Sequence, residues 1–179
     1  MFKKFAPILF LAALYTALLT NTAHANLSTA QAQIPDASLV GEGRLKVLFW
    51  KVFDAQLYAP AGEWSMQKPF ALSLAYLRRL KGDKIAERTI DEIRDQGFSD
   101  EAKLEAWFAQ IVAIFPDVDS RTTITGVFNE QKQTLFFMNG SFIGRIEDPE
   151  FGENFFNIWL GEKSSQPKLR NQLIGGLRT

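Results

Sequence analysis

The alternation of apolar and polar positions predicts its clearest structure in the stretch 135–160. There an apolar run is followed by Asn139-Gly140, the dipeptide that best accepts the two positive φ angles of a type I′ turn. We therefore expect 134–138 and 141–146 to pair as a β-hairpin. Asp148-Pro149-Glu150 has the composition of a helix start, and Gly161 that of a left-handed helix end. The large apolar side chains between them cover about half of the helix circumference, so this helix should be buried on more than one side.

The rest of the chain follows the same two periods. Alternation at every second residue predicts strands at 40–49 and 53–58, and a run that is apolar at nearly every position predicts a strand buried on both faces at 70–80. A further strand is expected at 122–128. A helical period predicts helices at 83–97 and 99–115, capped by Asp83 and Ser99, and a short helix at 168–174. The tally is about seven strands and three or four helices. Because the strands come in groups, the fold class expected is α+β, a largely antiparallel sheet with helices packed on one face.

The first 25 residues have the composition of a secretory signal peptide. Lys3 and Lys4 form a basic start, 8–19 is a short apolar run, and Ala23-His24-Ala25 is a small-residue cleavage site. We expect cleavage after Ala25 and a periplasmic location. The polar stretch 26–39 is then a flexible lead-in, and 40–177 forms a single domain.

Cleavage would leave a chain without cysteine or histidine, because His24 is the only histidine. That excludes Ser-His-Asp and Cys-His catalysis and thiolate or imidazole metal sites. Asp117 and Asp119 lack the glycine and the downstream acid of a calcium loop, so we interpret them as turn residues. No cofactor or metal is therefore expected. The mature chain would carry 18 basic and 20 acidic residues, a balance that gives no indication of nucleic-acid binding.

The residues resemble the chalcone isomerase-like family, specifically its secreted bacterial branch. Four stretches carry the resemblance and together span nearly all of 40–177: Gly41-Glu42-Gly43-Arg44-Leu45 through Tyr58-Ala59-Pro60, Tyr76-Leu77-Arg78 through Glu87-Arg88, Gly126-Val127-Phe128 through Gly140, and Asp148-Pro149-Glu150-Phe151 through Phe155-Phe156-Asn157-Ile158-Trp159-Leu160. The resemblance implies an open-faced β-sandwich, in which helices cover a large antiparallel sheet and a ligand binds in the apolar cleft between them.

The family has two kinds of member. True isomerases close a chalcone to a flavanone, whereas others bind fatty acids without chemistry. The isomerases carry an Arg on an early strand, which Arg44 matches. Their Thr, Tyr, Lys and Asn fall near Phe53, Ile85, Arg88 and Glu92. The resemblance therefore implies a binding cleft that has lost most of the catalytic groups.

Arg44 lies on a strand whose other face is apolar. If its own face points at the helices, its guanidinium would bind a carboxylate bidentately. Tyr58 and Tyr76 are the nearest aromatic hydroxyls, and Arg88 adds positive charge, so these four are the candidate ligand-binding residues. Alternatively, Arg44 is exposed or is paired with a carboxylate such as Glu42.

The preferred hypothesis is a secreted, non-catalytic protein that binds a fatty-acid-like or other amphipathic carboxylate. One alternative is an isomerase or intramolecular lyase acting on a chalcone-like enone, with Arg44 and Arg88 stabilising an enolate. Another is a structural or interaction protein of the envelope whose cleft is filled by its own side chains.

Overall fold

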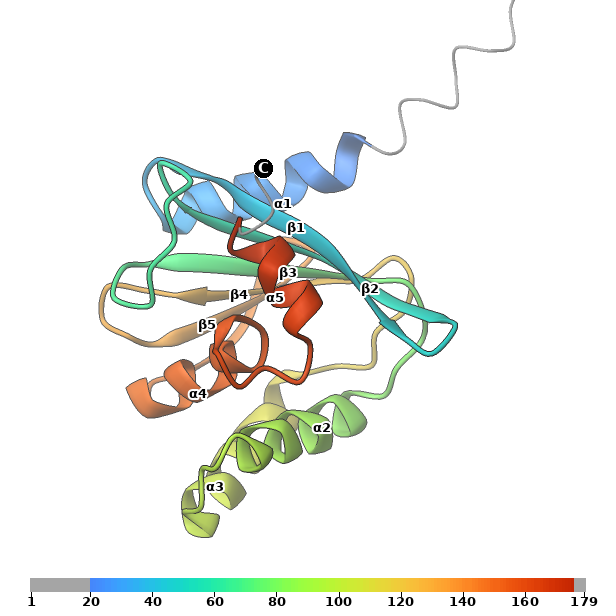
Figure 1. Ribbon diagram of the computed structural model, residues 1–179, viewed down its shortest axis with the longest axis vertical. Helices are drawn as coiled ribbons and strands as arrows, with labels where there is room; N and C mark the ends of the chain where they lie inside the picture. Colours follow the sequence, from blue (N-terminus) through green and yellow to red (C-terminus); the bar gives the residue numbers. More distant parts are fainter. Residues whose placement is uncertain (1–19, 176–179) are drawn as a thin grey trace, which may run out of the picture.

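The computed structural model describes residues 20–175, with side chains from Asn26 onward. Six strands form one antiparallel sheet, and each strand pairs with its neighbours in sequence (Figure 1). The strands are β1 (Ala37–Val47), β2 (Trp50–Pro60), β3 (Phe70–Tyr76), β4 (Thr123–Phe128), β5 (Thr134–Met138) and β6 (Ser141–Ile146). The helices are α1 (Thr20–Gln33), α2 (Gly82–Asp95), α3 (Glu101–Ile114), α4 (Pro149–Leu160) and α5 (Pro167–Leu173).

The expected α+β class with an antiparallel sheet is confirmed, but the expected tally was not accurate. Residues 20–175 form six strands rather than about seven, and five helices rather than three or four. The predicted strand 70–80 ends at Tyr76, beyond which the Leu77 N–H donates to the Val52 carbonyl at 2.9 Å and an isolated bridge joins Leu80 to Val118.

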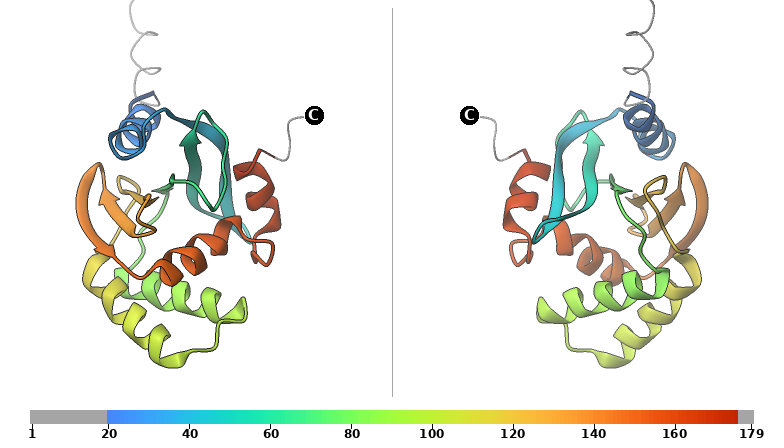
Figure 2. Two further views of the ribbon diagram at one scale, coloured as in Figure 1. Left: turned by 90° about the vertical axis from the view of Figure 1, so that its left-hand side faces the viewer. Right: turned by 90° about the vertical axis from the view of Figure 1, so that its right-hand side faces the viewer.

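Alternate strand residues point to opposite faces of the sheet, and both faces carry apolar side chains that helices cover. On one face Leu57, Leu72 and Phe136 join the main core with α2 to α5. On the other face Tyr58 and Phe137 belong to a smaller core beneath α1. Figure 2 shows α1 on the opposite side of the sheet from α2, α3 and α4. The prediction that helices pack on one face therefore holds for four of the five.

The N-terminal stretch 26–39 is not the loose lead-in expected from its polarity. It contains the last two turns of α1 and the start of β1. Ala30 and Ile34 are completely buried against the sheet, and Asn26 Nδ2 donates a hydrogen bond to Gln56 Oε1 at 3.0 Å. A stripe of only two small or branched side chains, four residues apart, is enough to dock a helix on a flat apolar surface. Such a stripe is too short to stand out in the sequence.

The β5–β6 hairpin turns as predicted. Asn139 and Gly140 have φ angles of 49° and 85°, both in the left-handed region. The same holds at the start of α4, where Asp148 is the N-cap and Pro149 occupies the first turn. Gly161, however, is extended, with φ of −75°. A Cβ there would lie 2.8 Å from the Asn157 carbonyl oxygen, so glycine is required by close approach rather than by a left-handed turn.

Two other helix starts differ from the prediction. α3 is capped by Asp100, one residue after Ser99. α2 begins at Gly82 after Lys81, not after Asp83. The cap of α2 comes from a distant turn, because the Gly82 backbone N–H donates to Asp117 Oδ1 at 3.1 Å and Lys81 pairs with the same carboxylate.

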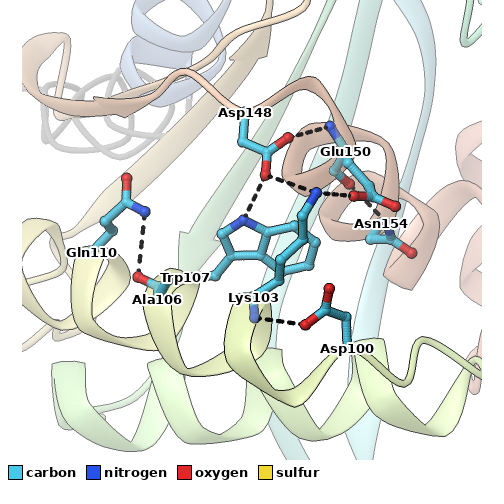
Figure 3. A network of polar contacts seen from close by, with 8 residues as sticks. All are labelled: Asp100, Lys103, Ala106, Trp107, Gln110, Asp148, Glu150 and Asn154. Atoms are coloured by element: carbon cyan, nitrogen blue, oxygen red, sulfur yellow. Dashed lines mark hydrogen bonds and ion pairs between the residues drawn. The ribbon is translucent and has the colours of Figure 1, made fainter.

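A small polar network joins α3 to α4 (Figure 3). Asp148 accepts a hydrogen bond from the Glu150 backbone N–H at 3.0 Å and another from the indole of buried Trp107 at 3.1 Å. Lys103 of α3 pairs with Glu150 at the edge of this network. One carboxylate therefore both caps α4 and satisfies a polar atom of the core.

Candidate functional site

The main cavity of the described chain lies between the sheet, α2 and α4. Its volume is about 320 Å³, at the small end of the roughly 300–1,000 Å³ typical of ligand pockets. The lining residues are Leu45, Val47, Val52, Phe53, Leu74, Tyr76, Leu80, Lys84, Ile85, Arg88, Thr89, Glu92, Phe115, Phe155, Ile158, Trp159 and Gln166.

The sheet and α4 supply an apolar wall. Strands β1 to β3 contribute aliphatic side chains and Phe53, which stands edge-on to Tyr76 with ring centroids 5.9 Å apart. Phe53 also stands edge-on to Trp159 of α4, at 5.3 Å. These three rings are held by one another, so the wall is preformed.

Helix α2 supplies a polar wall, because four of its residues that face the cavity are Lys84, Arg88, Thr89 and Glu92. The Arg88 side chain is 65 % exposed, so its charge lies at the rim, whereas the Glu92 side chain is only 10 % exposed. Glu92 pairs with Arg88 and accepts a hydrogen bond from Ser165 Oγ at 2.9 Å. The cavity is therefore amphipathic: the sheet and α4 form an apolar floor, and α2 forms a charged rim.

One buried polar atom of the lining residues has no hydrogen-bond partner within residues 20–175. The indole Nε1 of Trp159 is buried and unpaired. Burial raises the pKa of Tyr76, so its hydroxyl stays neutral and can donate a hydrogen bond. Buried polar groups are normally paired, and an unpaired one is a common mark of a missing ligand or water.

Arg44 and Tyr58 do not line this cavity, contrary to the sequence hypothesis. Leu45 and Phe53 face each other across β1 and β2 on the cavity side, so their neighbours Arg44 and Asp54 point to the opposite face. There Arg44 Nε lies 2.5 Å from Asp54 Oδ1 in a two-pronged exposed pair, which raises the pKa of the guanidinium. The alternative of an internally paired Arg44 is thus the correct one, with Asp54 in place of Glu42 as the partner.

Tyr58 lies beneath α1 and donates to Gln56 Oε1 at 2.9 Å. Burial and the charge of Glu42 raise its pKa to about 12. Arg44 instead borders a second cavity of about 240 Å³, together with residues of α5. Of the four candidate residues, the structure brings together Tyr76 and Arg88 in the main cavity and places Arg44 and Tyr58 elsewhere.

Four of the five positions that match the isomerase groups converge, and only Arg44 lies elsewhere. Phe53, Ile85, Arg88 and Glu92 all line the main cavity. Phe53 and Ile85 bring no hydroxyl, and the Arg88 charge is already paired with Glu92. The cavity therefore has the location expected from the resemblance but an apolar lining where that resemblance implies hydroxyls.

Sequence reasoning missed Lys84, Glu92 as an anion, and Trp159. The many charges of α2 favour a solvated face, and Asp91 and Arg94 do form an exposed ion pair there. The signal for the exceptions was their spacing, because Lys84, Arg88 and Glu92 recur every fourth residue on one helix edge. Trp159 was assigned to the core, where only its unpaired N–H distinguishes it.

Residues 20–175 hold no cluster of three or more acidic, histidine or cysteine side chains able to bind a metal ion. Within that part of the chain, every helix is too short or too polar to cross a bilayer.

Comparison with known proteins places the chain. A family model described as chalcone isomerase-like matches residues 23–175. The fold is similar to that of a fatty-acid binding protein of Arabidopsis thaliana, with a TM-score of 0.61, 13 % identity, and coverage of 81 % of this chain and 90 % of that one. A protein of Haemophilus influenzae, described only as uncharacterized, is 27 % identical over 125 residues, which is 69 % of this chain and 61 % of that relative. The chain, with its antiparallel sheet, covering helices and cavity between them, belongs to the chalcone isomerase-like family.

Proposed function

We propose that this chain is a secreted, periplasmic binding protein for an amphipathic carboxylate of the fatty-acid type. The observation that carries the proposal is the two-sided character of the main cavity. An apolar wall of aromatic and aliphatic side chains faces a helix edge that bears Lys84 and Arg88. An occupant that satisfies both walls has an apolar body and an anionic end.

The anionic end fits the rim. One terminal nitrogen of the Arg88 guanidinium donates to Glu92. The remaining N–H groups of the planar guanidinium can donate to a bound carboxylate. Lys84 lies one helical turn away and is paired only with exposed Glu87. A carboxylate at this rim would be held by charge while staying partly hydrated, which avoids the cost of burying an ion.

The apolar end fits the floor. Trp159 offers a buried unpaired N–H, Tyr76 offers a neutral hydroxyl, and the sheet and α4 residues around them are apolar. The small volume favours a short, bent or partly protruding chain. The similar Arabidopsis fold belongs to a protein named for fatty-acid binding, which supports this ligand class. The basic start, apolar run and Ala23-His24-Ala25 site support export.

The ligand should leave chemically unchanged. Closing a chalcone-like enone needs a hydroxyl or ordered water near the reacting oxygen, and Phe53 and Ile85 supply none at the matching positions. The remaining cation, Arg88, is held by Glu92.

Native mass spectrometry of the protein purified from periplasm, followed by extraction of any bound lipid, tests the proposal first. Added oleate should bind, with dissociation measured by calorimetry. Arg88→Gln is expected to weaken oleate binding about fivefold to tenfold, the loss of one partly exposed charged hydrogen bond. Leu74→Trp should abolish binding by filling the cavity from the sheet side.

The matched control is Arg145→Gln, because Arg145 is also exposed and paired with a carboxylate but lies on β6 outside the cavity. Oleate affinity that ignores Leu74→Trp, or that falls equally in the control, would contradict the assigned site. Turnover of a chalcone above the buffer rate would contradict the non-catalytic proposal.

A further inference from the structure

The turn between β1 and β2 displays large apolar side chains to solvent. We call Val47, Leu48, Phe49 and Trp50 the hairpin tip. Their exposed fractions are 50 %, 85 %, 98 % and 62 %, and they are consecutive in sequence. A contiguous exposed apolar patch of this kind marks an interaction surface more often than chance.

The residues of this turn are unfavourable for folding. Leu48 has a φ of 54°, a left-handed angle that a leucine side chain disfavours. In the β5–β6 turn of the same chain the left-handed positions are occupied by Asn139 and Gly140, which accept a positive φ more readily than leucine does. The hairpin tip therefore keeps apolar side chains where polar or small ones would be easier to fold.

Cationic side chains surround the tip. Lys46 and Lys51 are directly opposite each other on β1 and β2, an arrangement of like charges that destabilises a strand pair. The Arg78 guanidinium lies 4.9 Å from the centre of the Trp50 ring. None of the ion pairs within residues 20–175 uses these three cations. The sequence 43–53 contains no acidic residue. We call Lys46, Lys51 and Arg78 the basic collar.

The hairpin tip is next to the main cavity. Val47, which belongs to the tip, and Val52, two residues beyond it, both line that cavity. Figure 1 shows the β1–β2 turn at the periphery of the molecule, at the other end of the hairpin from the C-terminal end of α1. A surface that covers the tip would therefore also face the cavity.

We propose that the hairpin tip inserts into the surface of an anionic lipid bilayer while the basic collar contacts the lipid headgroups. Leucine, phenylalanine and tryptophan with flanking lysines are the composition of interfacial anchors, in which apolar side chains enter the acyl boundary and cations bind anionic lipid. Docking does not depend on the proposed function. Docking would also bring the cavity close to the lipid, from which an amphipathic carboxylate can enter, and this second part rests on the proposed function.

A bilayer is favoured over a protein partner by shape and charge. A narrow turn buries little area against a rigid protein surface, far less than a stable interface needs. A fluid bilayer can close around such a turn. The unpaired collar adds attraction to a surface of continuous negative charge, which an apolar protein groove would not satisfy.

Vesicle co-sedimentation tests the proposal, with vesicles of phosphatidylglycerol and phosphatidylethanolamine in equal parts and of neutral phosphatidylcholine alone. The protein should bind the anionic vesicles, and high salt should weaken binding because it screens the collar. In the double variant Leu48→Asn, Phe49→Gly, asparagine relieves the strain at the one left-handed position of the turn and offsets the backbone entropy that glycine adds, so the variant should fold about as well. It is expected to bind anionic vesicles at least about tenfold more weakly, because two apolar side chains no longer leave water.

The charge variant Lys46→Gln, Lys51→Gln should lose about fivefold for each lysine removed. Val112→Asn, which removes an exposed apolar side chain from α3, and Arg145→Gln are the matched controls and should bind as the unchanged protein does.

Absence of binding to anionic vesicles would overturn the proposal, as would equal binding by the Leu48→Asn, Phe49→Gly variant. Concentration-dependent dimers that this variant abolishes, without vesicle binding, would overturn it in favour of a second copy of the chain. Oleate affinity measured without vesicles should be the same in this variant and in the unchanged protein, since neither residue lines the cavity. Failure of docking and failure of ligand binding are thus separately visible.

Discussion

Replacing Asp148 with alanine removes an N-cap, a hydrogen bond to a buried indole and a longer ion pair with Lys103 at 3.7 Å, and the structure allows the costs of the first two to be separated. The carboxylate caps α4 through the Glu150 N–H and accepts the indole N–H of Trp107. Loss of an N-cap costs about 1 kcal/mol. A buried donor left without a partner costs about 1–3 kcal/mol. Because the Asp148 side chain is 32 % exposed, water can partly replace it, and the total expected for Asp148→Ala is about 2–3 kcal/mol.

Asp100→Ala is the matched control, because Asp100 caps α3 through the Lys103 N–H at 3.1 Å and is exposed. It should cost only the capping part, about 1 kcal/mol. Asp148→Asn keeps one acceptor oxygen, and asparagine is a good N-cap, so its cost should be about half that of Asp148→Ala. Urea unfolding followed by tryptophan fluorescence measures all three.

A double-mutant cycle with Trp107→Phe isolates the second interaction. In the phenylalanine background the cost of Asp148→Ala should fall to that of Asp100→Ala, because no indole N–H remains to be left unpaired. The reasoning is refuted if Asp148→Ala costs no more than Asp100→Ala, or if its cost is the same in both backgrounds.

Three further predictions concern the cavity, the core and the charge state. Glu92→Gln should strengthen oleate binding several-fold in calorimetry, because it removes the anion that competes with the bound carboxylate; a weaker affinity would show that Glu92 organises the rim instead. Gly152→Ala should destabilise the protein by about 1–3 kcal/mol in urea despite better helix propensity, since the added Cβ would lie 2.6 Å from a ring carbon of Phe128; a neutral effect would mean that this ring shifts freely. Burial raises the pKa of Tyr76 above its ordinary value of 10, so above pH 10 this tyrosine ionises first in the unfolded chain. The free energy of unfolding that depends on Tyr76 is therefore fully present below pH 10 and is lost as the pH rises further. Unfolding measured across this range should show a smaller slope in Tyr76→Phe, and an unchanged slope would refute the assignment.

Much of the fold could be predicted because its signals are local. The Asn139-Gly140 turn and the Asp148 cap act within four residues, and both are present in the structure. The cap of α2 could not be predicted, because its carboxylate comes from Asp117, thirty-five residues away. The docking of α1 was missed for a similar reason, since Ala30 is buried only by strands that follow it in the chain.

The candidate site depended on a property that sequence alone does not determine. Period-two alternation divides β1 into two faces but does not say which one the helices cover. Arg44 was placed in the cleft on the assumption that the helices cover its face of β1. The paired residues Leu45 and Phe53 line the cavity instead, so Arg44 lies on the opposite face. Tyr76 and Arg88 do line the cavity, because their positions on β3 and α2 do not depend on which face of β1 the helices cover. Trp159 was inaccessible to sequence reasoning, since an unpaired N–H is a property of its surroundings.

The sequential strand order has a consequence for how the protein folds. All strand pairs join sequence neighbours, and four of the five connections are short; only β3 and β4 are separated by two helices. β1 to β3 and β4 to β6 can therefore each form as a meander from local contacts, and joining β3 to β4 is the step that must overcome the largest loop-closure entropy. The cavity takes Phe53 and Leu74 from the first meander and Phe155 and Trp159 from the helix that follows the second. We expect the cavity to be absent from either half and to appear only when they join, so that any bound ligand would slow unfolding by holding the two halves together.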